Sequence, residues 1–537
     1  GNSASCSFAD NGSFSVNVRV NDGDGGVVTS STVVTVDNVV PTVNAGPDAT
    51  INEGSTFSGS GSFTDPGADT WTATVNYGDG SGVQALTLSG KTFSLSHVYA
   101  DNGSFTVNVC VTDDDGGNGC DTAAVTVNNV APTVTNNLAT QSVQYSDPIG
   151  NVTVTAKDVA ADTGLTAATS WSKDGGASTP GLPGGIAGIT PPGAGACSTN
   201  GVVATCTWTV GGKALVAPGT YTVTVEVTDK DGGAGSTAFT IVVTQEDART
   251  TYTGAMFAAT ASTTSSSATV TLAATVQDIT AVDPTGDPDP GDIRKAMVTF
   301  VNRDASSAVL CTASVGLVNP ADTKTGTATC NWNATITGDS QSFTVGVIVN
   351  NYYTRNDSAD NDVVTVSKPL TSNFITGGGY LALTNSSGLK AGDAGKKNNF
   401  GFNVKYNKSG TNLQGNMNTI IRRTESDGLH VYQIKGNAMT SLTVNPSLCP
   451  KATSAAPCTA VFNGKANIQD ITNPSAPVSV DGNATLQVTM TDKGEPGSSD
   501  SISITVWNKA GGLWFASKWD GVKTVEQLLG GGNLVVH

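Results

Sequence analysis

The sequence of 537 residues is poor in charged and aromatic residues, which account for 13% and 6% of the chain. Lys and Arg number 27 against 44 Asp and Glu, and the resulting net charge of -17 excludes the basic surface that nucleic acids require. The same balance disfavours attraction to an anionic lipid surface. No run of about 18 apolar residues is present. We therefore expect neither a nucleic-acid partner nor membrane insertion.

The sequence also lacks the common catalytic motifs: no Gly-x-Ser-x-Gly, His-Glu-x-x-His or phosphate-binding loop occurs. Only three histidines are present: His97 in a His-x-Tyr pattern, where we expect a structural role, His430 in an alternating stretch, and His537. The acidic residues cluster in turns, whereas the paired carboxylates of glycoside hydrolases flank a scissile bond in a pocket. We therefore predict that the chain is not an enzyme.

What the sequence does contain is strand and turn residues. Short Val- and Thr-rich runs alternate apolar with polar positions and are interrupted by Gly, Asp, Asn and Pro. Such alternation is typical of sheets with one buried and one solvated face. A hydrophobic content of 38% is too low for one large core but sufficient for several thin sandwiches. We predict an all-β fold of tandem β-sandwich domains.

One hairpin design recurs along the chain. Residues 9–26 (ADNGSFSVNVRVNDGDGG) match residues 100–117 (ADNGSFTVNVCVTDDDGG) at an offset of 91, and residues 219–233 (GTYTVTVEVTDKDGG) repeat its core. Within SFTVNVCV the apolar residues occupy every second position, which predicts a half-buried strand. The Asp- and Gly-rich end predicts a turn, because these residues tolerate positive φ.

The segment 40–132 resembles the PKD domain family. The matching residues are Tyr77-Gly-Asp-Gly80, His97-Val-Tyr99 and the strand and turn of residues 103–117. PKD domains are seven-stranded sandwiches of secreted and cell-surface proteins and are not enzymes themselves, so the resemblance implies this fold and setting. Residues 1–39 resemble only the second half of such a domain.

The remaining segments carry β patterns of other kinds. Residues 133–245, with a Gly/Pro-rich loop at 179–197, and residues 246–370 resemble bacterial Ig-like domains. Residues 371–537 resemble the post-COAP type C-terminal domain of secreted bacterial proteins, through NFITGGGY, NFGFNVKY and DSISITVW. Near the end, VEQLLGG predicts one or two helical turns before a last strand. The predicted organisation is a partial PKD-like domain (1–39), a PKD domain (40–132), two Ig-like sandwiches (133–245 and 246–370) and a distinct C-terminal all-β domain (371–537).

Eight of the nine cysteines form pairs of near neighbours: Cys110 with Cys120, Cys197 with Cys206, Cys311 with Cys330, and Cys449 with Cys458. None has the C-x-x-C spacing of zinc or thioredoxin sites, which favours four local disulfides over metal binding. Buried free thiols are the alternative. Disulfides would place the protein in an oxidising compartment, and we expect secretion to a bacterial cell surface. Cys6 has no neighbour.

Calcium is the cofactor that the acidic turns of the PKD-like segment suggest. Ca²⁺ prefers several oxygen ligands at once and screens crowded carboxylates. The resemblance to PKD domains implies a site near a domain junction that includes Asn38. The alternative is that these residues are ordinary solvent-facing turn residues. The same two alternatives, calcium ligands or solvent-facing turn residues, apply to the acidic loop 283–292 (DPTGDPDPGD). The candidate metal ligands are Asp65, Asp69, Asp113 and Asp115.

Aromatic residues concentrate near the C-terminus, at Trp507, Trp514 and Trp519. Exposed on a β surface they would stack on sugar rings, and buried they would form the core of the last domain. We predict an extracellular structural or adhesive protein, a subunit of a surface or filament assembly that calcium stiffens. The alternative is an accessory carbohydrate-binding protein that acts through this aromatic-rich domain.

Residues 1–39 provide the expected contact with partners. By the repeat they hold only the last strands of a sandwich, which would expose Phe14, Val16, Val18 and Val20 and leave strand edges unpaired. Three explanations for the missing half of the sandwich compete. It was cleaved from the chain and remains attached through a disulfide to Cys6, or it is part of the protein but not of this sequence, or another subunit supplies it. We favour the last possibility, self-association or contact with neighbouring surface proteins.

Overall fold

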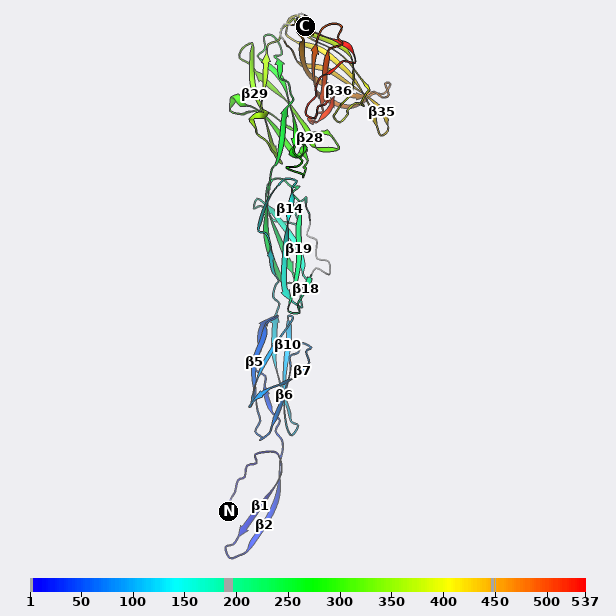
Figure 1. Cartoon of the computed structure of the whole chain (residues 1–537). Coiled ribbons are helices and arrows are strands. Elements are labelled where there is room, and N and C mark those ends of the chain that lie inside the picture. Colours follow the sequence, from blue (N-terminus) through cyan, green and yellow to red (C-terminus); the bar gives the residue numbers. More distant parts are fainter. Residues whose placement is uncertain (1–2, 188–196, 446–448, 450) are drawn as a thin grey trace.

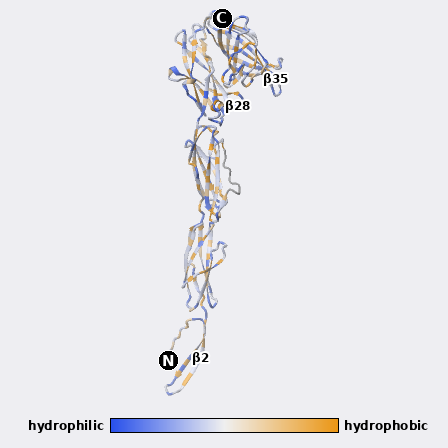
Figure 2. Ribbon diagram, in the orientation of Figure 1, coloured by the Kyte–Doolittle hydropathy of each residue, from blue (hydrophilic) through white to orange (hydrophobic). Residues whose placement is uncertain are grey.

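The computed structural model describes residues 3–187, 197–445, 449 and 451–537. Within these residues the regular elements are β-strands and four short 3₁₀-helices, and none is an α-helix. Figure 1 shows the β units following one another along a rod: a narrow shaft, made of the units before residue 246, ends in a broader head formed by residues 246–537. Hydrophobic residues are spread along the whole length (Figure 2), as expected of a series of small cores. The predicted all-β class of tandem sandwiches is confirmed.

The N-terminal segment is a single hairpin. Strands β1 (Gly12–Asn21) and β2 (Val27–Val36) pair with each other and, within the described residues, with no other strand. Phe14 and Val16 are half-buried, but Val18 is 53%, Val20 62% and Val28 71% exposed. The hairpin therefore carries an exposed apolar strip, as predicted for Val18 and Val20, whereas Phe14 is partly covered because it stacks on Phe8 with ring centroids 4.7 Å apart.

Residues 40–132, here called the first sandwich, form two sheets around a small core. Val107, Val109 and Val111 are fully buried, as the alternating pattern predicts. The turn glycine Gly116 has a φ of 89°, in the region that favours glycine. One sheet is β3 (Thr42–Asn44), β5 (Thr56–Thr64), β9 (Thr92–Val98) and β8 (Leu88–Ser89). The other is β4 (Ala49–Asn52), β11 (Asn118–Asn128), β10 (Gly103–Asp113), β6 (Trp71–Asn76) and β7 (Val83–Leu86).

Residues 133–245, the second sandwich, also form two sheets. One is β12 (Thr133–Asn136), β14 (Pro148–Val159), β19 (Val203–Lys213) and β17 (Ile186–Ala187), with β18 (Cys197–Thr199) also on β19. The other is β13 (Thr140–Gln144), β21 (Ala234–Thr244), β20 (Gly219–Thr228), β15 (Thr166–Lys173) and β16 (Thr179–Pro180). The middle of the predicted loop, residues 188–196, lies outside the described residues.

Residues 246–370, the third sandwich, repeat the two-sheet arrangement. One sheet is β27 (Gly316–Asn319), β28 (Asp322–Thr335), β24 (Ser267–Asp278), β22 (Glu246–Tyr252) and β30 (Tyr353–Thr354). The other is β23 (Phe257–Ala259), β31 (Asp362–Ser367), β29 (Ser340–Asn351), β25 (Ala296–Asn302) and β26 (Ala308–Ser314). The cores of the second and third sandwiches are continuous. This pair of sandwiches is therefore joined by apolar packing.

Residues 371–537, the C-terminal domain, differ by forming one ten-stranded sheet. The strands are β32 (Phe374–Ala382), β33 (Lys397–Tyr406), β34 (Leu413–Glu425), β35 (Gly428–Asn445), β36 (Cys458–Asp470), β37 (Val478–Asp492), β38 (Ser501–Trp507), β39 (Leu513–Ala516), β40 (Gln527–Leu528) and β41 (Gly531–Val536). The expected last strand is present as β41, but the predicted helical turn is wrong. Gln527 and Leu528 instead pair with β38, because an unpaired sheet edge is available to them.

All four predicted disulfides are present. Cys110 lies opposite Cys120 across β10 and β11, with their Cα atoms 4.1 Å apart, and Cys197 lies opposite Cys206 in the same way. The bond between Cys311 and Cys330 joins β26 to β28 and thereby links the two sheets of the third sandwich. Four disulfides fit an oxidising, extracellular compartment.

Candidate cation sites at the domain junctions

Carboxylates gather where one unit of the shaft meets the next. The spacing Asp-x-x-x-Asp occurs at Asp65–Asp69, Asp158–Asp162 and Asp283–Asp287. Each pair belongs to a loop of one sandwich, and at least one of its members lies within 4.8 Å of a carboxylate from the preceding unit. We call the junctions first to fourth, starting from the contact between the hairpin segment and the first sandwich.

At the first junction, oxygens of Asp10, Asp69 and Asp115 all lie within 4.8 Å of one another. Asp10 comes from the hairpin segment, whereas the other two come from separate loops of the first sandwich. Asp69 is 7% exposed, and its Oδ2 has no hydrogen-bond partner among the described residues. Burial, with the charges of Asp65 and Asp10, raises the pKa of Asp69 to about 6. A cavity of about 140 Å³ opens between the two units here.

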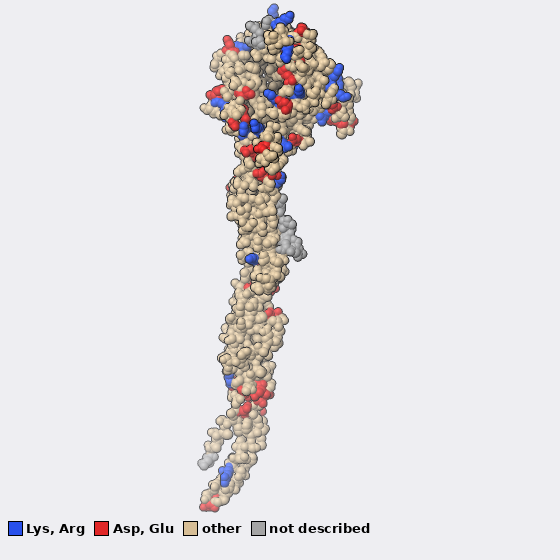
Figure 3. Space-filling view, in the orientation of Figure 1, with Lys and Arg blue, Asp and Glu red and all other residues tan. Residues whose placement is uncertain are grey.

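Two of the four predicted ligands lie in this cluster and two do not. Asp69 and Asp115 are brought together, but Asp65 accepts hydrogen bonds from the amide of Gly67 at 3.2 Å and the indole of Trp71 at 3.0 Å. Asp113 accepts from the Gly117 amide at 2.6 Å and the Asn38 side chain at 2.9 Å. Asp65 therefore stabilises its own loop, and Asp113 stabilises its own turn and, through Asn38, the linker before the first sandwich. Figure 3 shows the acidic atoms gathered at this end of the first sandwich.

The second junction holds a cluster that the sequence analysis missed. Glu53, at the end of β4, meets Asp158 and Asp162 of the second sandwich within 4.8 Å. Their exposed fractions are 3%, 8% and 0%, and each has one oxygen without a hydrogen-bond partner in the described part of the chain. The side-chain oxygen of Asn129 in the linker is likewise unpaired. Burial raises the pKa of Glu53, and that of Asp158 to about 6. The recurring Asp-x-x-x-Asp spacing was the signal available for Asp158 and Asp162.

A lysine occupies the outer part of the second junction. The Lys230 Nζ lies 2.7 Å from Asp101, 2.5 Å from Asp162 and 2.7 Å from Asp231. Burial opposes the charge, but the hydrogen bonds to these carboxylates raise the pKa of the Lys230 ammonium above its ordinary value. Asp101 belongs to the first sandwich, so this ammonium bridges two units.

The third junction combines carboxylates with apolar contacts. Asp147, Glu246 and Asp287 lie within 4.8 Å of one another, and Glu246 is fully buried with an unpaired Oε2 within the described chain. Burial, with the charges of Asp287 and Asp278, raises the pKa of Glu246 to about 9. The acidic loop 283–292 thus contributes one member of the cluster, Asp287.

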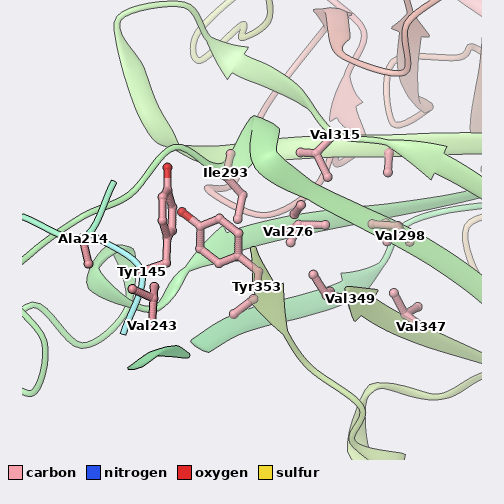
Figure 4. Close-up of a cluster of buried hydrophobic side chains, with 14 of the residues drawn as sticks. Tyr145, Ala214, Val243, Val276, Ile293, Val298, Val315, Val347, Val349 and Tyr353 are labelled. Atoms are coloured by element: carbon pink, nitrogen blue, oxygen red, sulfur yellow. The ribbon is translucent and has the colours of Figure 1, made fainter. Parts of the chain in front are cut away.

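Aromatic packing adds apolar contacts between the two sandwiches at this third junction. The Tyr145 ring lies 4.9 Å from that of Tyr352 and 5.7 Å from that of Tyr353. Figure 4 shows Tyr145 and Tyr353 beside Ile293 in the core that runs through both sandwiches. Lys213 of the second sandwich also pairs with Asp289 of the third at 2.6 Å.

The tryptophans of the C-terminal domain are buried. Trp507 is 2%, Trp514 1% and Trp519 9% exposed, so of the two alternatives they are core residues and do not form an exposed surface on which sugars could stack. Trp507 and Trp519 form a cluster with Ala273 and Val318 of the third sandwich. On β38 the core residues Ile502 and Ile504 occupy one face, so Trp507 lies on the other, which the third sandwich covers. The sequence analysis did not foresee that the third sandwich covers this second face of β38.

Both internal histidines have structural partners. His97 stacks on Tyr77 with ring centroids 4.2 Å apart, and its Nε2 lies 2.6 Å from Asp79. This agrees with the structural role expected for the His-x-Tyr pattern. His430 lies between Asp470 at 2.6 Å from Nδ1 and Asp427 at 3.0 Å from Nε2.

The junction clusters are chemically suited to a hard divalent cation. Their ligand atoms are carboxylate oxygens, without thiol or imidazole, and Ca²⁺ takes about six to eight such oxygens. Three carboxylates within 4.8 Å repel one another unless a cation or protons neutralise them. The residues of the first and second junctions therefore fit calcium, with Asp69 and Asp115 as predicted ligands and Glu53, Asp158 and Asp162 as further ones.

Comparison with known proteins identifies one segment of the chain: residues 38–128 match the PKD domain family. No curated protein matches the chain. Among solved structures, one that is similar to the chain is a tetra-tandem repeat in the extending region of a large adhesion protein (14% identity, TM-score 0.31, covering 90% of this chain and 99% of that one).

Two further structures are a three-Ig structure of titin domains (11%, TM-score 0.21, covering 61% and 97%) and the adhesin InvE of Yersinia pseudotuberculosis (17%, TM-score 0.20, covering 37% and 58%). Within the described chain, no helix is long and apolar enough to cross a lipid bilayer.

Proposed function

We propose that the chain is a structural or adhesive rod on a bacterial cell surface, or a subunit of a surface filament, and that calcium ions at its junctions hold the shaft straight. The observation that carries this proposal is the cluster of Glu53, Asp158 and Asp162. It joins two successive sandwiches and leaves three carboxylates buried with unpaired oxygens. The four disulfides and the PKD match of residues 38–128 support the extracellular setting.

The physical reason for a cation is the cost of burying unpaired charge. A carboxylate that leaves water loses its hydration, and a neighbouring carboxylate makes that loss worse. A Ca²⁺ ion between Glu53 of one sandwich and the Asp158–Asp162 pair of the next replaces the lost hydration with ion–oxygen bonds. Because the ligands come from both units, the ion resists bending between them.

The test is the shape of the whole chain in solution with and without calcium. We expect small-angle scattering in millimolar calcium to report an extended rod, and addition of a chelator to broaden the distribution of lengths. Glu53→Gln with Asp158→Asn should remove much of this response, while Asp393→Asn in the C-terminal domain, far from every junction cluster, should leave it intact. A scattering profile that calcium leaves unchanged would contradict calcium stiffening, and a compact profile in both conditions would contradict the rod.

We also propose that residues 1–39 pair with a second copy of the chain. What supports this is the exposed strip of Val18, Val20 and Val28 and the unpaired edges of β1 and β2. Val20 and Val28 lie directly opposite each other on one face of the hairpin, whereas Val33 lies on the other face. In sedimentation, Val20→Lys with Val28→Lys should reduce self-association more than Val33→Lys does. Equal effects, or a chain that is monomeric throughout, would argue against this pairing.

A further inference from the structure

The first and second junctions contain equivalent sets of three carboxylates. Asp10 and Asp101 occupy the same place in the repeated ADNG sequence. Asp69 and Asp162 each end an Asp-x-x-x-Asp loop, and Asp115 and Asp231 each precede the Gly-Gly of the recurring turn. In the structure, Asp10, Asp69 and Asp115 form one cluster, and Asp101, Asp162 and Asp231 form the other. The same carboxylate cradle therefore occurs twice.

The two cradles differ at one position of the turn. In the second junction that position is Lys230, whose ammonium contacts all three carboxylates within 2.7 Å. In the first junction it is Asp114, whose carboxylate instead accepts a hydrogen bond from the Thr70 amide at 3.0 Å. Across the described residues, no Lys, Arg or His side chain forms an ion pair with Asp10, Asp69 or Asp115.

We propose that Lys230 is a built-in cation that takes the place of a metal ion in the second cradle, and that the first cradle, which lacks it, binds a divalent cation, calcium by the hardness of its oxygens. The buried and unpaired Oδ2 of Asp69 is the second observation that points to a ligand there. The cavity of about 140 Å³ at this junction, which Asp10 and Asp69 line, leaves room for an ion and its water.

This inference rests on the proposed function, because it assumes that junction carboxylates take calcium. It goes further because it states that one turn position, Asp114 in the first cradle and Lys230 in the second, determines whether the cradle binds an ion. The cluster of Glu53, Asp158 and Asp162 lies beside the second cradle and shares Asp162 with it, so the second junction combines one site for an ion with one site filled by the lysine.

The experiment exchanges the two residues in the full chain and counts bound calcium by equilibrium dialysis. Asp114→Lys should bind one ion fewer than the parent, because the new ammonium fills the first cradle. Lys230→Met should bind one ion more, because the second cradle loses its ammonium. The double variant should return to the parent count. Thermal unfolding of each variant verifies that it is folded.

Two matched controls separate the ammonium from incidental changes. Asp114→Asn keeps an acceptor for the Thr70 amide without a positive charge, and should retain the parent count. Lys157→Met removes an exposed lysine beside Asp158 on β14 that, within the described chain, forms no ion pair with the junction carboxylates, and should gain no ion.

The outcomes distinguish this inference from the proposed function. A parent chain that binds calcium in a number that neither Asp114→Lys nor Lys230→Met changes would overturn this inference alone. A parent chain that binds no calcium would overturn both. Loss of an ion in Asp114→Asn equal to that in Asp114→Lys would show that the Asp114 carboxylate itself is a ligand, which would also overturn the role given to the lysine.

Discussion

The second and fourth junctions both join two units end to end, but the second does so mainly through charged groups and the fourth mainly through apolar packing. The second joins two sandwiches through charge: buried carboxylates, and the Lys230 ammonium that bridges Asp101 and Asp162. The fourth joins the third sandwich to the C-terminal domain through Trp507 and Trp519, packed on apolar residues. Hydrogen bonds across the fourth interface, such as that from the Thr327 hydroxyl to the Gly511 carbonyl at 3.0 Å, add to the packing.

If the junctions bind calcium as proposed, this difference gives one chain a fixed head and a shaft that responds to ions. Apolar burial depends little on dissolved cations, so we expect the fourth junction to keep its geometry when their concentration changes. Carboxylates are stable when buried only while a cation or proton accompanies them. The third junction is intermediate, because Tyr145 packs there beside the Glu246 cluster. From the N-terminus to the C-terminus the junctions therefore pass from polar to apolar.

The largest expected effect is loss of the head interface. Trp507→Ala removes a buried indole and should lower the free energy of unfolding by about 3–5 kcal/mol. Denaturant unfolding measures this change, and the response of the shaft to calcium should stay as in the parent. Val309→Ala, at a position that is 64% exposed, should cost less than about 0.5 kcal/mol. A small cost for Trp507→Ala would mean that the head is not held by its tryptophans.

Within the head, the bond between Cys311 and Cys330 links two sheets. Replacing both cysteines with serine should lower the free energy of unfolding by about 3 kcal/mol, because the unfolded chain regains the freedom of a closed loop. The loop between Cys110 and Cys120 in the shaft is shorter, with a sequence separation of 10 against 19, so its removal should cost less. Calorimetry of the two variants compares them, and the reverse order would count against the loop-entropy explanation.

Removal of calcium should affect the shaft and leave the head unaffected. A ligand at 100 times its dissociation constant stabilises the native state by about 2.7 kcal/mol. We expect chelation to increase hydrogen exchange at the first and second junctions and to leave β38 and β39 unchanged. Glu53→Gln with Asp158→Asn should remove the response at the second junction only. Equal exchange changes in the head would contradict the contrast between the two kinds of junction.

The smallest effect concerns a pH-sensitive pair within the head. Hydrogen bonds to Asp470, and then to Asp427, raise the pKa of His430 above its ordinary value. A histidine with a raised folded-state pKa contributes stability that is fully present below about pH 6.5 and is lost as the pH rises through the raised value. NMR titration of the imidazole should show this pKa, and Asp470→Asn should lower it. An unshifted His430 would refute the pairing, whether or not calcium is present.

The sequence alone determined the local features of this protein. Alternation of apolar residues predicted the buried face of β10, because a strand exposes successive side chains to opposite sides. The short cysteine spacings predicted the disulfides, since cross-strand neighbours in a hairpin are close in sequence. The repeat of 91 residues identified the recurring turn, whose Gly116 has the positive φ that the turn requires.

Only the tertiary structure decided what happens between units. Asp10 meets Asp69, and Lys230 meets Asp101, because whole sandwiches pack end to end, and no local periodicity encodes that contact. For the same reason Trp507 is buried, since a second unit covers the face of β38 that the sheet itself leaves open. Side-chain alternation specifies which face a residue occupies. Whether water, a cation or another domain covers that face depends on the packing of rigid units distant in sequence.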